Sequence, residues 1–118
     1  KLINSILVTG GPKFNSPRKN NIFQEYIKVS NLTEANIRKF GSAALNLSYV
    51  AAGRFDAYWE WELNLWDIAA GMVILREAGG YIEFMEPGSS SSFKCNVIAS
   101  NSSIHEELKG VLAKKNIE

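Results

Sequence analysis

The sequence contains 118 residues, of which 46% are hydrophobic and 21% are charged. This composition is typical of a soluble globular domain with one core, and it excludes an intrinsically disordered chain. Thirteen basic and twelve acidic side chains leave a net charge of +1. This charge is too small to indicate electrostatic binding to nucleic acid or to an anionic membrane. No apolar run approaches the roughly 18 residues that a membrane-spanning helix needs, so we expect a cytoplasmic protein.

The first part of the chain predicts a strand, a helix and a second strand. The apolar residues 6–8 indicate a short buried strand that ends in a turn at 10–12, where two glycines and a proline lack the spacing of a nucleotide-binding loop. Ser16 is expected to cap a helix with Pro17 at its first position, because apolar residues then recur at helical spacing. After a polar link, residues 37–40 predict the second strand.

A second helix and an alternating strand follow. Gly41 and Ser42 open the helix, and Gly53 is placed to end it. The strand at 55–61 alternates between two sets of residues, so that one face meets a core and the other is free to serve a cleft. The first face carries Phe55, Ala57, Trp59 and Trp61, and the second carries Asp56, Tyr58 and Glu60. Because two tryptophans lie on the apolar face, we interpret them as core residues rather than as a stacking platform.

The next part of the chain predicts a third helix and two further strands. Residues 68–78 are apolar almost all round, which indicates a helix that is buried on every side. Gly79 and Gly80 supply the left-handed backbone with which such a helix ends. Strands are expected at 81–84 and 96–99, separated by a run rich in serine.

The last helix is predicted from a capping box formed by Ser103 and Glu106. Its apolar stripe consists of Ile104, Leu108, Val111 and Leu112. His105 falls inside the box and is expected at the surface, whereas Cys95 lies in an apolar run and is expected to be a buried thiol rather than a nucleophile. Strands that alternate with helices over the whole length predict a single layered α/β domain.

Asp67 is the candidate metal ligand. An isolated aspartate at a helix start is more often an N-cap that accepts hydrogen bonds from the first-turn amides. The neighbours favour a second interpretation, because Trp66 would shield the carboxylate from water and the small residues 69–71 would admit another backbone close behind it. A carboxylate held in this way suits Mg²⁺, which prefers oxygen ligands and takes one or two carboxylates from a protein.

Two further features are candidates for substrate binding. Spacing alone makes Glu60 an exposed strand residue, whereas beside a sugar-like ligand its carboxylate would accept a hydrogen bond from a polyol hydroxyl. Gly41, Ser42 and Ala43 form a helix start, and their small side chains would also bring backbone amides close to a ligand or an anion.

Four segments of the sequence together resemble the C-terminal half of the inositol monophosphatase family, the bacterial SuhB-type proteins included. The segments read GSAALNL at 41–47, VAAGRFDAYWE at 50–60, WDIAAG at 66–71 and EAGG at 77–80. The resemblance runs in order from about Ser5 to the last helix, and its part from 41 to 80 is highly specific.

The resemblance implies an αβαβα sandwich in which this chain forms a lobe with a mixed sheet flanked by helices. It also implies a Mg²⁺-dependent, lithium-sensitive phosphomonoesterase with its cleft between two lobes. Asp67 resembles the family's metal-ligating aspartate that follows a tryptophan. Gly41, Ser42 and Ala43 resemble the segment whose backbone lines the substrate pocket. Glu60 resembles the glutamate that accepts a hydrogen bond from an inositol hydroxyl, which makes an inositol monophosphate the expected substrate.

The family's first signature, Asp-Pro-Ile/Leu-Asp-Gly-Thr, and the glutamate upstream of it are absent from the sequence. In the family, those residues supply most of the metal ligands, the water-activating threonine and the amides that hold the phosphate. We therefore interpret residues 1–118 as a single C-terminal lobe that lacks the N-terminal metal- and phosphate-binding lobe. Because one carboxylate cannot hold a two-metal site, we expect the chain alone to be inactive or nearly so. Separately, we expect the full-length protein to be a homodimer.

Two other functions remain open at this point. SuhB-type relatives also act as protein partners of the bacterial transcription apparatus, a role that needs surface contacts and no metal. A phosphatase of the same type could instead act on a sugar bisphosphate or another small phosphomonoester. The resemblance places Asn64 at a pocket position that varies within the family, so it does not choose among these substrates.

Overall fold

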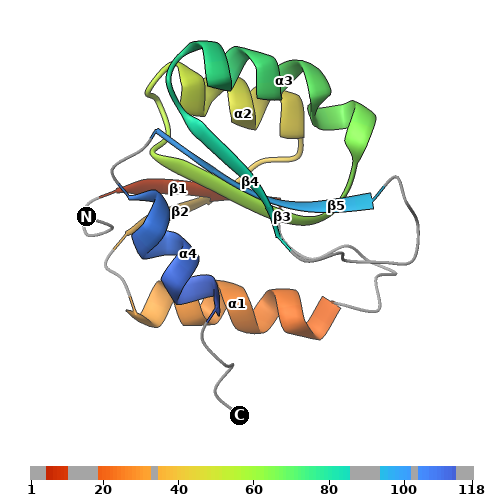
Figure 1. Ribbon diagram of the computed structural model, residues 1–118. Helices are drawn as coiled ribbons and strands as arrows, with labels where there is room; N and C mark the ends of the chain where they lie inside the picture. The colour runs from red at the N-terminus through yellow and green to blue at the C-terminus, as the bar shows by residue number, and fades with distance from the viewer. Residues whose placement is uncertain (1–4, 11–18, 33–34, 86–93, 102–103, 114–118) are drawn as a thin grey trace.

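The computed structural model describes residues 5–10, 19–32, 35–85, 94–101 and 104–113. These residues form a five-stranded mixed sheet with helices on both faces, in the strand order β2-β1-β3-β5-β4 (Figure 1). β1 is parallel to β2 and β3, whereas β5 is antiparallel to β3 and β4. The strands are β1 (Ile6–Thr9), β2 (Asn36–Lys39), β3 (Ala57–Asn64), β4 (Tyr81–Met85) and β5 (Lys94–Ser100). The helices are α1 (Lys19–Leu32), α2 (Ala43–Ala51), α3 (Leu65–Glu77) and α4 (His105–Ala113). The predicted layered α/β fold is confirmed.

Several predictions fall on residues outside the described ranges. They concern the helix cap at Ser16 with Pro17, the turn residues 11–12, the serine-rich run and the capping residue Ser103. The side chain of Cys95 also lies outside the described part of the chain, although its backbone belongs to β5.

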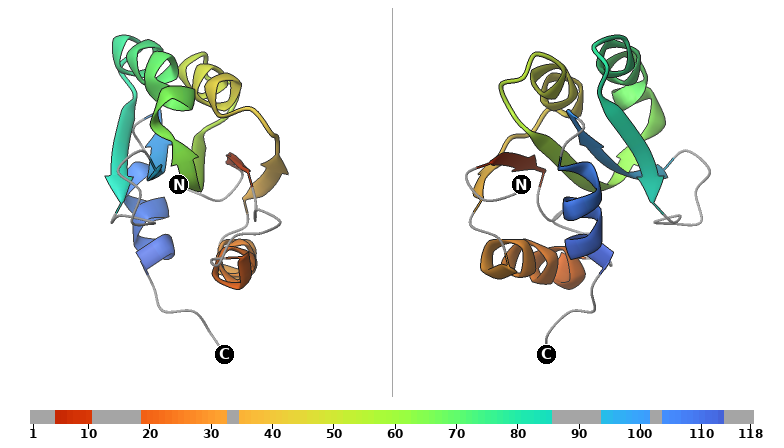
Figure 2. Two further views of the ribbon diagram at one scale, coloured as in Figure 1. Left: turned by 90° about the vertical axis from the view of Figure 1, so that its right-hand side faces the viewer. Right: turned by 60° about the vertical axis from the view of Figure 1, so that its left-hand side comes forward.

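A pair of helices covers each face of the sheet (Figure 2). α2 and α3 pack together over one face, and α1 and α4 lie over the other. The cluster beneath α1 and α4 contains Leu7, Val29, Ala57, Trp59, Ile98, Ile104, Leu108, Val111 and Leu112. The cluster beneath α2 and α3 contains Val8, Ala43, Leu47, Val50, Tyr58, Leu63, Ile68, Leu75, Val97 and Ala99. The predicted apolar stripe of the last helix is thus confirmed as core.

Strand β3 is buried on both of its faces. Trp59 and Trp61 are 1% and 6% exposed, which confirms them as core residues. The opposite face was expected to serve a cleft, yet Tyr58 on that face is fully buried beneath α2 and α3. The expectation was wrong for this residue because β3 is an inner strand of the sheet and helices cover it from both sides. A register shift between Glu60 and Leu63 then interrupts the alternation and turns Leu63 toward the same cluster as Tyr58.

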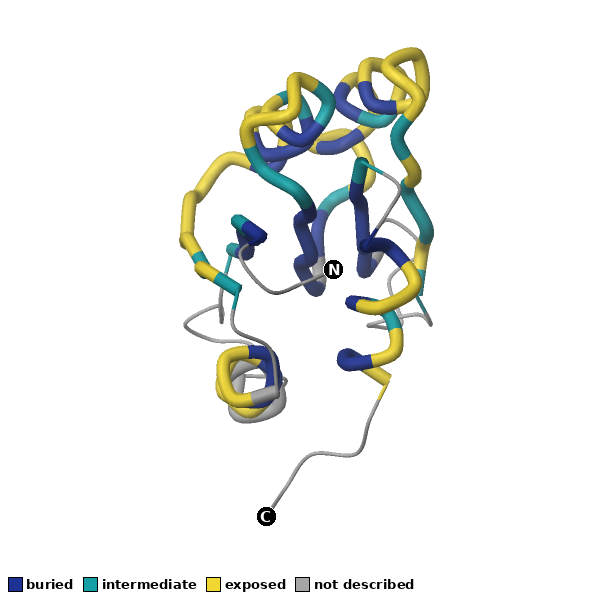
Figure 3. The backbone as a smooth tube through the Cα atoms, turned by 90° about the vertical axis from the view of Figure 1, so that its left-hand side faces the viewer, coloured by how far each residue is buried: buried dark blue, intermediate teal, exposed yellow. Residues whose placement is uncertain are grey.

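Helix α3 is buried along one side only. Its buried residues are Ile68, Gly71 and Leu75, whereas Trp66 and Val73 are 64% and 62% exposed. The prediction of a helix buried on every side was therefore wrong for the described residues, since the sheet and α2 cover a single flank (Figure 3). No helix in the described part of the chain is long and apolar enough to cross a membrane.

The predicted ends of α2 and α3 agree with the structure. Ser42 caps α2, because its side chain accepts a hydrogen bond from the amide of Leu45 at 3.2 Å. Gly53 follows the C-cap of α2 with φ of +80°, and Gly79 follows that of α3 with φ of +84°. A side chain would strain the backbone at both glycines.

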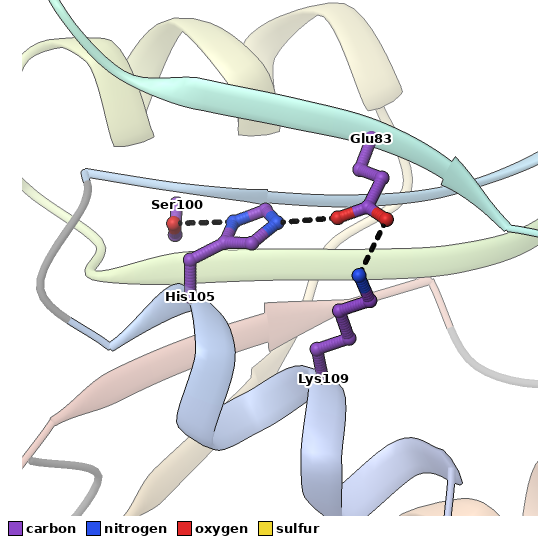
Figure 4. A network of polar contacts seen from close by, with 4 residues as sticks. All are labelled: Glu83, Ser100, His105 and Lys109. Carbon is purple, nitrogen blue, oxygen red and sulfur yellow. Dashed lines mark hydrogen bonds and ion pairs between the residues drawn. The ribbon is translucent and has the colours of Figure 1, made fainter.

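His105 was expected at the surface, but it is only 5% exposed. Its ring lies between Ser100 and Glu83, with Nδ1 2.7 Å from the Ser100 hydroxyl and Nε2 3.2 Å from Glu83 Oε1 (Figure 4). Lys109 Nζ lies 2.7 Å from the other carboxylate oxygen of Glu83. Hydrogen bonds from Lys109 and His105 hold the pKa of Glu83 below its ordinary value of 4.5. The expectation was wrong because the first turn of α4 packs against β5 and beside β4, which spacing within the helix does not reveal.

Candidate functional site at the carboxyl ends of the parallel strands

The carboxyl ends of three parallel strands meet at one edge of the sheet, and the predicted site residues follow these ends. Gly41 and Ser42 lie in the connection from β2 to α2, Ala43 is the first residue of α2, and Glu60 lies on β3 just past its pairing with β1. Asp67 lies in the first turn of α3, which follows β3 directly. Ligands of open α/β sheets bind outside the carboxyl ends of the strands. The structure therefore brings the sequence-predicted residues to an edge that is suited to binding.

The start of α2 presents its backbone at this edge. Ser42 uses its carbonyl and its hydroxyl to accept the amides of Asn46 and Leu45. The buried side chain of Asn46 donates to the carbonyl of Phe40 at 3.2 Å, which holds the preceding loop against the helix. A Cβ at Gly41 would meet no atom within 4 Å. Because the Ser42 hydroxyl is engaged in capping, a ligand at this segment would meet backbone groups of the first turn.

Glu60 is a buried carboxylate rather than an exposed one. It is 5% exposed, and the hydroxyl of Tyr58 donates a hydrogen bond to Oε1. The interpretation of Glu60 as an exposed strand residue was wrong, because α2 and α3 cover this face of β3. A buried carboxylate needs hydrogen-bond donors to offset its loss of hydration. The Glu60 carboxylate is therefore buried and hydrogen-bonded, and it lies at the same edge of the sheet as the other predicted site residues.

Asp67 is exposed and belongs to the first turn of α3. The N-cap of this helix is Asn64, so the interpretation of Asp67 as the cap residue was wrong. The side-chain amide nitrogen Nδ2 of Asn64 donates to Asp67 Oδ2 at 3.3 Å, and the positive end of the helix dipole favours a negative charge there. Trp66 beside it is 64% exposed. The predicted shielding of the carboxylate by Trp66 is therefore not found among the described residues.

Asp67 can supply one of the several ligands that a magnesium ion needs. Within the described ranges, no group of three or more His, Cys, Asp or Glu side chains could hold a metal ion. An exposed carboxylate at a helix start has the oxygen chemistry that Mg²⁺ prefers, and Mg²⁺ takes only one or two carboxylates together with waters and phosphate oxygens. Asp67 thus suits part of a coordination shell that other groups complete.

The small residues after Asp67 differ in their surroundings. Ala69 and Ala70 are exposed, whereas Gly71 is buried against α2. A Cβ at Gly71 would lie 2.8 Å from both Cβ and Cδ1 of Leu47. The expected approach of another backbone behind Asp67 is therefore not found at these residues, because the atoms nearest Gly71 belong to the side chain of Leu47. Gly71 instead admits this side chain where α3 packs on α2.

The roles of two residues, one at the site and one away from it, were not recognised from the sequence. A Cβ built on Gly10 would overlap the carboxylate atoms of Glu60, and the only signal in the sequence was a glycine directly after a strand. Asp56 lies at the opposite end of β3, where its Oδ2 accepts the Ile6 amide at 2.8 Å and its own amide donates to the Ile6 carbonyl. Asp56 therefore joins the starts of β1 and β3 and lies away from the site.

Comparisons with known proteins converge on one family. The model described as "Inositol monophosphatase family" matches residues 3–116. The inositol-1-monophosphatase of Mesorhizobium japonicum is 39% identical over 108 residues, which cover 92% of this chain and 40% of that protein. The Nus factor SuhB of Haemophilus influenzae is 42% identical over 106 residues, which cover 88% of this chain and 39% of that protein.

The solved structures agree with these relatives. The extragenic suppressor protein suhB from Bartonella henselae superimposes with a TM-score of 0.83 at 41% identity, covering 97% of this chain and 43% of that one. The chain therefore spans about 40% of the length of the curated relatives that it matches.

Proposed function

Because this chain belongs to the inositol monophosphatase family, we propose that it forms the C-terminal lobe of a Mg²⁺-dependent phosphomonoesterase that acts on an inositol monophosphate. The observation that carries the proposal is the gathering of Gly41–Ala43, Glu60 and Asp67 at the carboxyl ends of the parallel strands. In this proposal residues 1–118 are one lobe, and the remaining metal and phosphate ligands come from a further part of the protein.

Each residue has a distinct role in the proposed site. The Asp67 carboxylate would supply one oxygen ligand to Mg²⁺. Bound there with its other ligands, Mg²⁺ would supply an activated water and would neutralise charge on the phosphoryl oxygens. Glu60 would accept a hydrogen bond from a substrate hydroxyl, and the backbone at Gly41–Ala43 would line the pocket for the alcohol portion. Together these groups would orient the alcohol and leave the phosphate to the rest of the site.

Within the described ranges, no group of three or more His, Cys, Asp or Glu side chains could hold a metal ion, which supports the proposal that this chain alone is inactive or nearly so. Two metals that stabilise both the attacking and the leaving oxygen need several ligands. The same incompleteness leaves the substrate open between inositol monophosphate, a sugar bisphosphate and another small phosphate ester.

A second candidate function is that of a non-catalytic interaction module of the transcription apparatus. It is favoured by the likeness to a protein named Nus factor SuhB and by the outward side of α3, where Trp66 and Val73 are 64% and 62% exposed. Large exposed apolar side chains that lie near one another mark surfaces for protein contact. The same surface supports the proposal of a homodimer for the full-length protein.

The test of the phosphatase proposal restores the other part of the enzyme. This chain is joined to the N-terminal part of the Mesorhizobium relative, and phosphate release from inositol 1-phosphate is measured with and without Mg²⁺. Asp67→Asn is expected to abolish most of the Mg²⁺-dependent rate. The matched control is Glu77→Gln, which changes an exposed carboxylate at the far end of the same helix and should leave the rate unchanged.

Each outcome of this test separates the candidates. Equal rates in the parent and Asp67→Asn would contradict the metal-ligand role. An absence of hydrolysis across a panel of inositol, sugar and aryl phosphates would contradict the phosphatase proposal. Capture of transcription factors that survives both Asp67→Asn and a chelator would support the interaction module.

A further inference from the structure

We propose that Tyr58 and Gly10 are positioning residues that hold the Glu60 carboxylate in one orientation at the binding edge, and that this arrangement selects substrates with a polyol hydroxyl. The inference rests on the proposed function in one respect, because it takes from there the role of Glu60 as a hydrogen-bond acceptor for substrate.

The first support is the burial of the pair. Tyr58 is fully buried and Glu60 is 5% exposed, and the Tyr58 hydroxyl donates to Oε1 of Glu60. The two residues are two positions apart on β3, so their side chains emerge on the same face of the sheet. A hydrogen bond to an ionised carboxylate is stronger than one between neutral groups. Because the tyrosine ring is fixed in the core beneath α2 and α3, its hydroxyl is a fixed point for the carboxylate.

The second support is the space left by Gly10. The parallel pairing of β1 with β3 ends at Thr9 opposite Trp59, so the next residues, Gly10 and Glu60, are neighbours. A Cβ at Gly10 would overlap Cδ and both carboxylate oxygens of Glu60. The backbone of Gly10 does not have the positive φ found at Gly53 and Gly79. Its lack of a side chain therefore serves to make room for the carboxylate.

These two contacts restrict the carboxylate from two sides. A carboxylate has about four lone-pair positions, so one bond from Tyr58 is compatible with a further bond from a ligand hydroxyl. With Oε1 committed to Tyr58 and the carboxylate atoms packed against Gly10, the direction of Oε2 is also determined. The register shift that begins after Glu60 places this group where β3 leaves its regular pairing with β5. A group fixed before binding loses less entropy when it meets its ligand.

The chemistry of the ligand follows from the chemistry of the acceptor. An ionised carboxylate only accepts hydrogen bonds, so it recognises a donor such as a hydroxyl on the alcohol portion of a phosphate ester. A phosphate ester without such a hydroxyl leaves the carboxylate without that partner. The arrangement therefore favours inositol and sugar phosphates over simple aryl phosphates, without contributing to the reaction at phosphorus.

The experiment uses the joined two-part enzyme with Tyr58→Phe and Gly10→Ala. Tyr58→Phe removes the hydroxyl and keeps the buried ring, while Gly10→Ala displaces the end of a flexible side chain. We expect each variant to raise the KM for inositol 1-phosphate about tenfold, the loss that follows from weakening one hydrogen bond to a charged group, with kcat changed less than about twofold. Hydrolysis of phenyl phosphate, which has no neighbouring hydroxyl, should keep its kcat/KM.

Matched controls and a double-mutant cycle complete the test. Tyr49→Phe changes a tyrosine that is 37% exposed on α2, and Gly110→Ala adds a methyl group where no atom lies within 4 Å. Both should leave the KM unchanged. Either positioning variant combined with Glu60→Gln should add little to the effect of Glu60→Gln alone, because all three act on one group. An unchanged KM, or an equal loss for both substrates, would overturn the proposal.

A spectroscopic measurement tests the positioning of Glu60 even if the parent protein hydrolyses none of these substrates. In the same joined protein, the carboxyl carbon of Glu60 is followed by ¹³C NMR after labelling of glutamate. Tyr58→Phe and Gly10→Ala should each move this resonance, and Tyr49→Phe should not. A resonance that stays in place in both positioning variants would refute the positioning role. If the resonance moves in both variants but the parent protein hydrolyses none of the substrates, the positioning role stands and only the phosphatase proposal is refuted.

Discussion

Two glycine-to-alanine substitutions on different helices are expected to change stability in opposite directions. Gly71 lies in α3 against α2, and Gly110 lies in α4 with open space around it. Replacement of a helical glycine by alanine removes conformational freedom from the unfolded chain and stabilises by about 0.5–1 kcal/mol where the new methyl group fits. Both substitutions should therefore gain this helix-propensity term, and they differ only in whether the added methyl group fits its surroundings.

The cost at Gly71 follows from the structure. The added Cβ would lie 2.8 Å from Cβ and Cδ1 of Leu47, well inside the optimal separation of about 3.5–4.0 Å between carbon atoms. Leu47 is fully buried, and its Cβ is tied to the backbone, so rotation of the side chain cannot relieve both contacts. Overpacking of a core costs about 1–3 kcal/mol. After the propensity gain, Gly71→Ala should destabilise by about 1 kcal/mol, and Gly110→Ala should stabilise by about 0.5–1 kcal/mol.

Urea unfolding followed by circular dichroism measures both changes. With a slope of about 2 kcal/mol per molar urea, the midpoint should fall by about 0.5 M in Gly71→Ala and rise by about 0.3–0.5 M in Gly110→Ala. A rise of similar size in both variants would refute the close packing of α2 on α3. A fall in both would instead show that the surroundings of Gly110 are more crowded than the structure describes.

Three further predictions concern single contacts. Ser42→Ala removes the cap of α2 and should lower the free energy of unfolding by about 1 kcal/mol, whereas Ser42→Asp should restore most of it in a urea titration. Since Lys109 and His105 lower the pKa of Glu83, this carboxylate contributes stability above the unfolded carboxyl pKa that is lost as the pH falls through the folded value. Melting temperatures between pH 7 and pH 3 should thus decline less steeply in Glu83→Gln than in the parent, and identical profiles would contradict the linkage. Asp56→Asn should weaken the bond to the amide at the start of β1, and unchanged hydrogen exchange of that amide would contradict the assigned contact.

Local rules were sufficient for the existence of the described elements, for the start of α2 and for the glycines that end α2 and α3, whereas the bounds of β3, α3 and β5 differ from those predicted. Ser42 caps α2, and Gly53 and Gly79 have the positive φ expected of helix exits. These features depend on a few neighbouring residues, so spacing and residue type predict them directly. The alternation along β3 likewise identified Trp59 and Trp61 as core, because period-two spacing reports one face of a strand.

The errors share a cause that no local pattern contains. His105, Glu60 and Tyr58 were assigned to exposed or cleft-facing positions, and all three are buried. Each is covered by a neighbouring helix or strand, and a pattern within one element says nothing about which other elements lie on top of it. α3 shows the converse error, since an apolar sequence predicted burial on every side, while the described residues cover one flank only.

The position of the candidate site depends on contacts of this long-range kind. Gly41–Ala43 lie at the start of α2 and Asp67 lies in α3, and the two helices pack together with Gly71 against Leu47. Glu60 is in turn held between Tyr58 and Gly10, the residue that follows β1. Loosening either contact should therefore alter the relative placement of groups that do not touch one another. One result would separate the two contacts: Gly71→Ala lowers stability and leaves the KM for inositol 1-phosphate unchanged, while Gly10→Ala raises the KM and leaves stability unchanged. Helix packing and carboxylate placement would then act independently, and residues of the strands rather than of the helices would select the substrate.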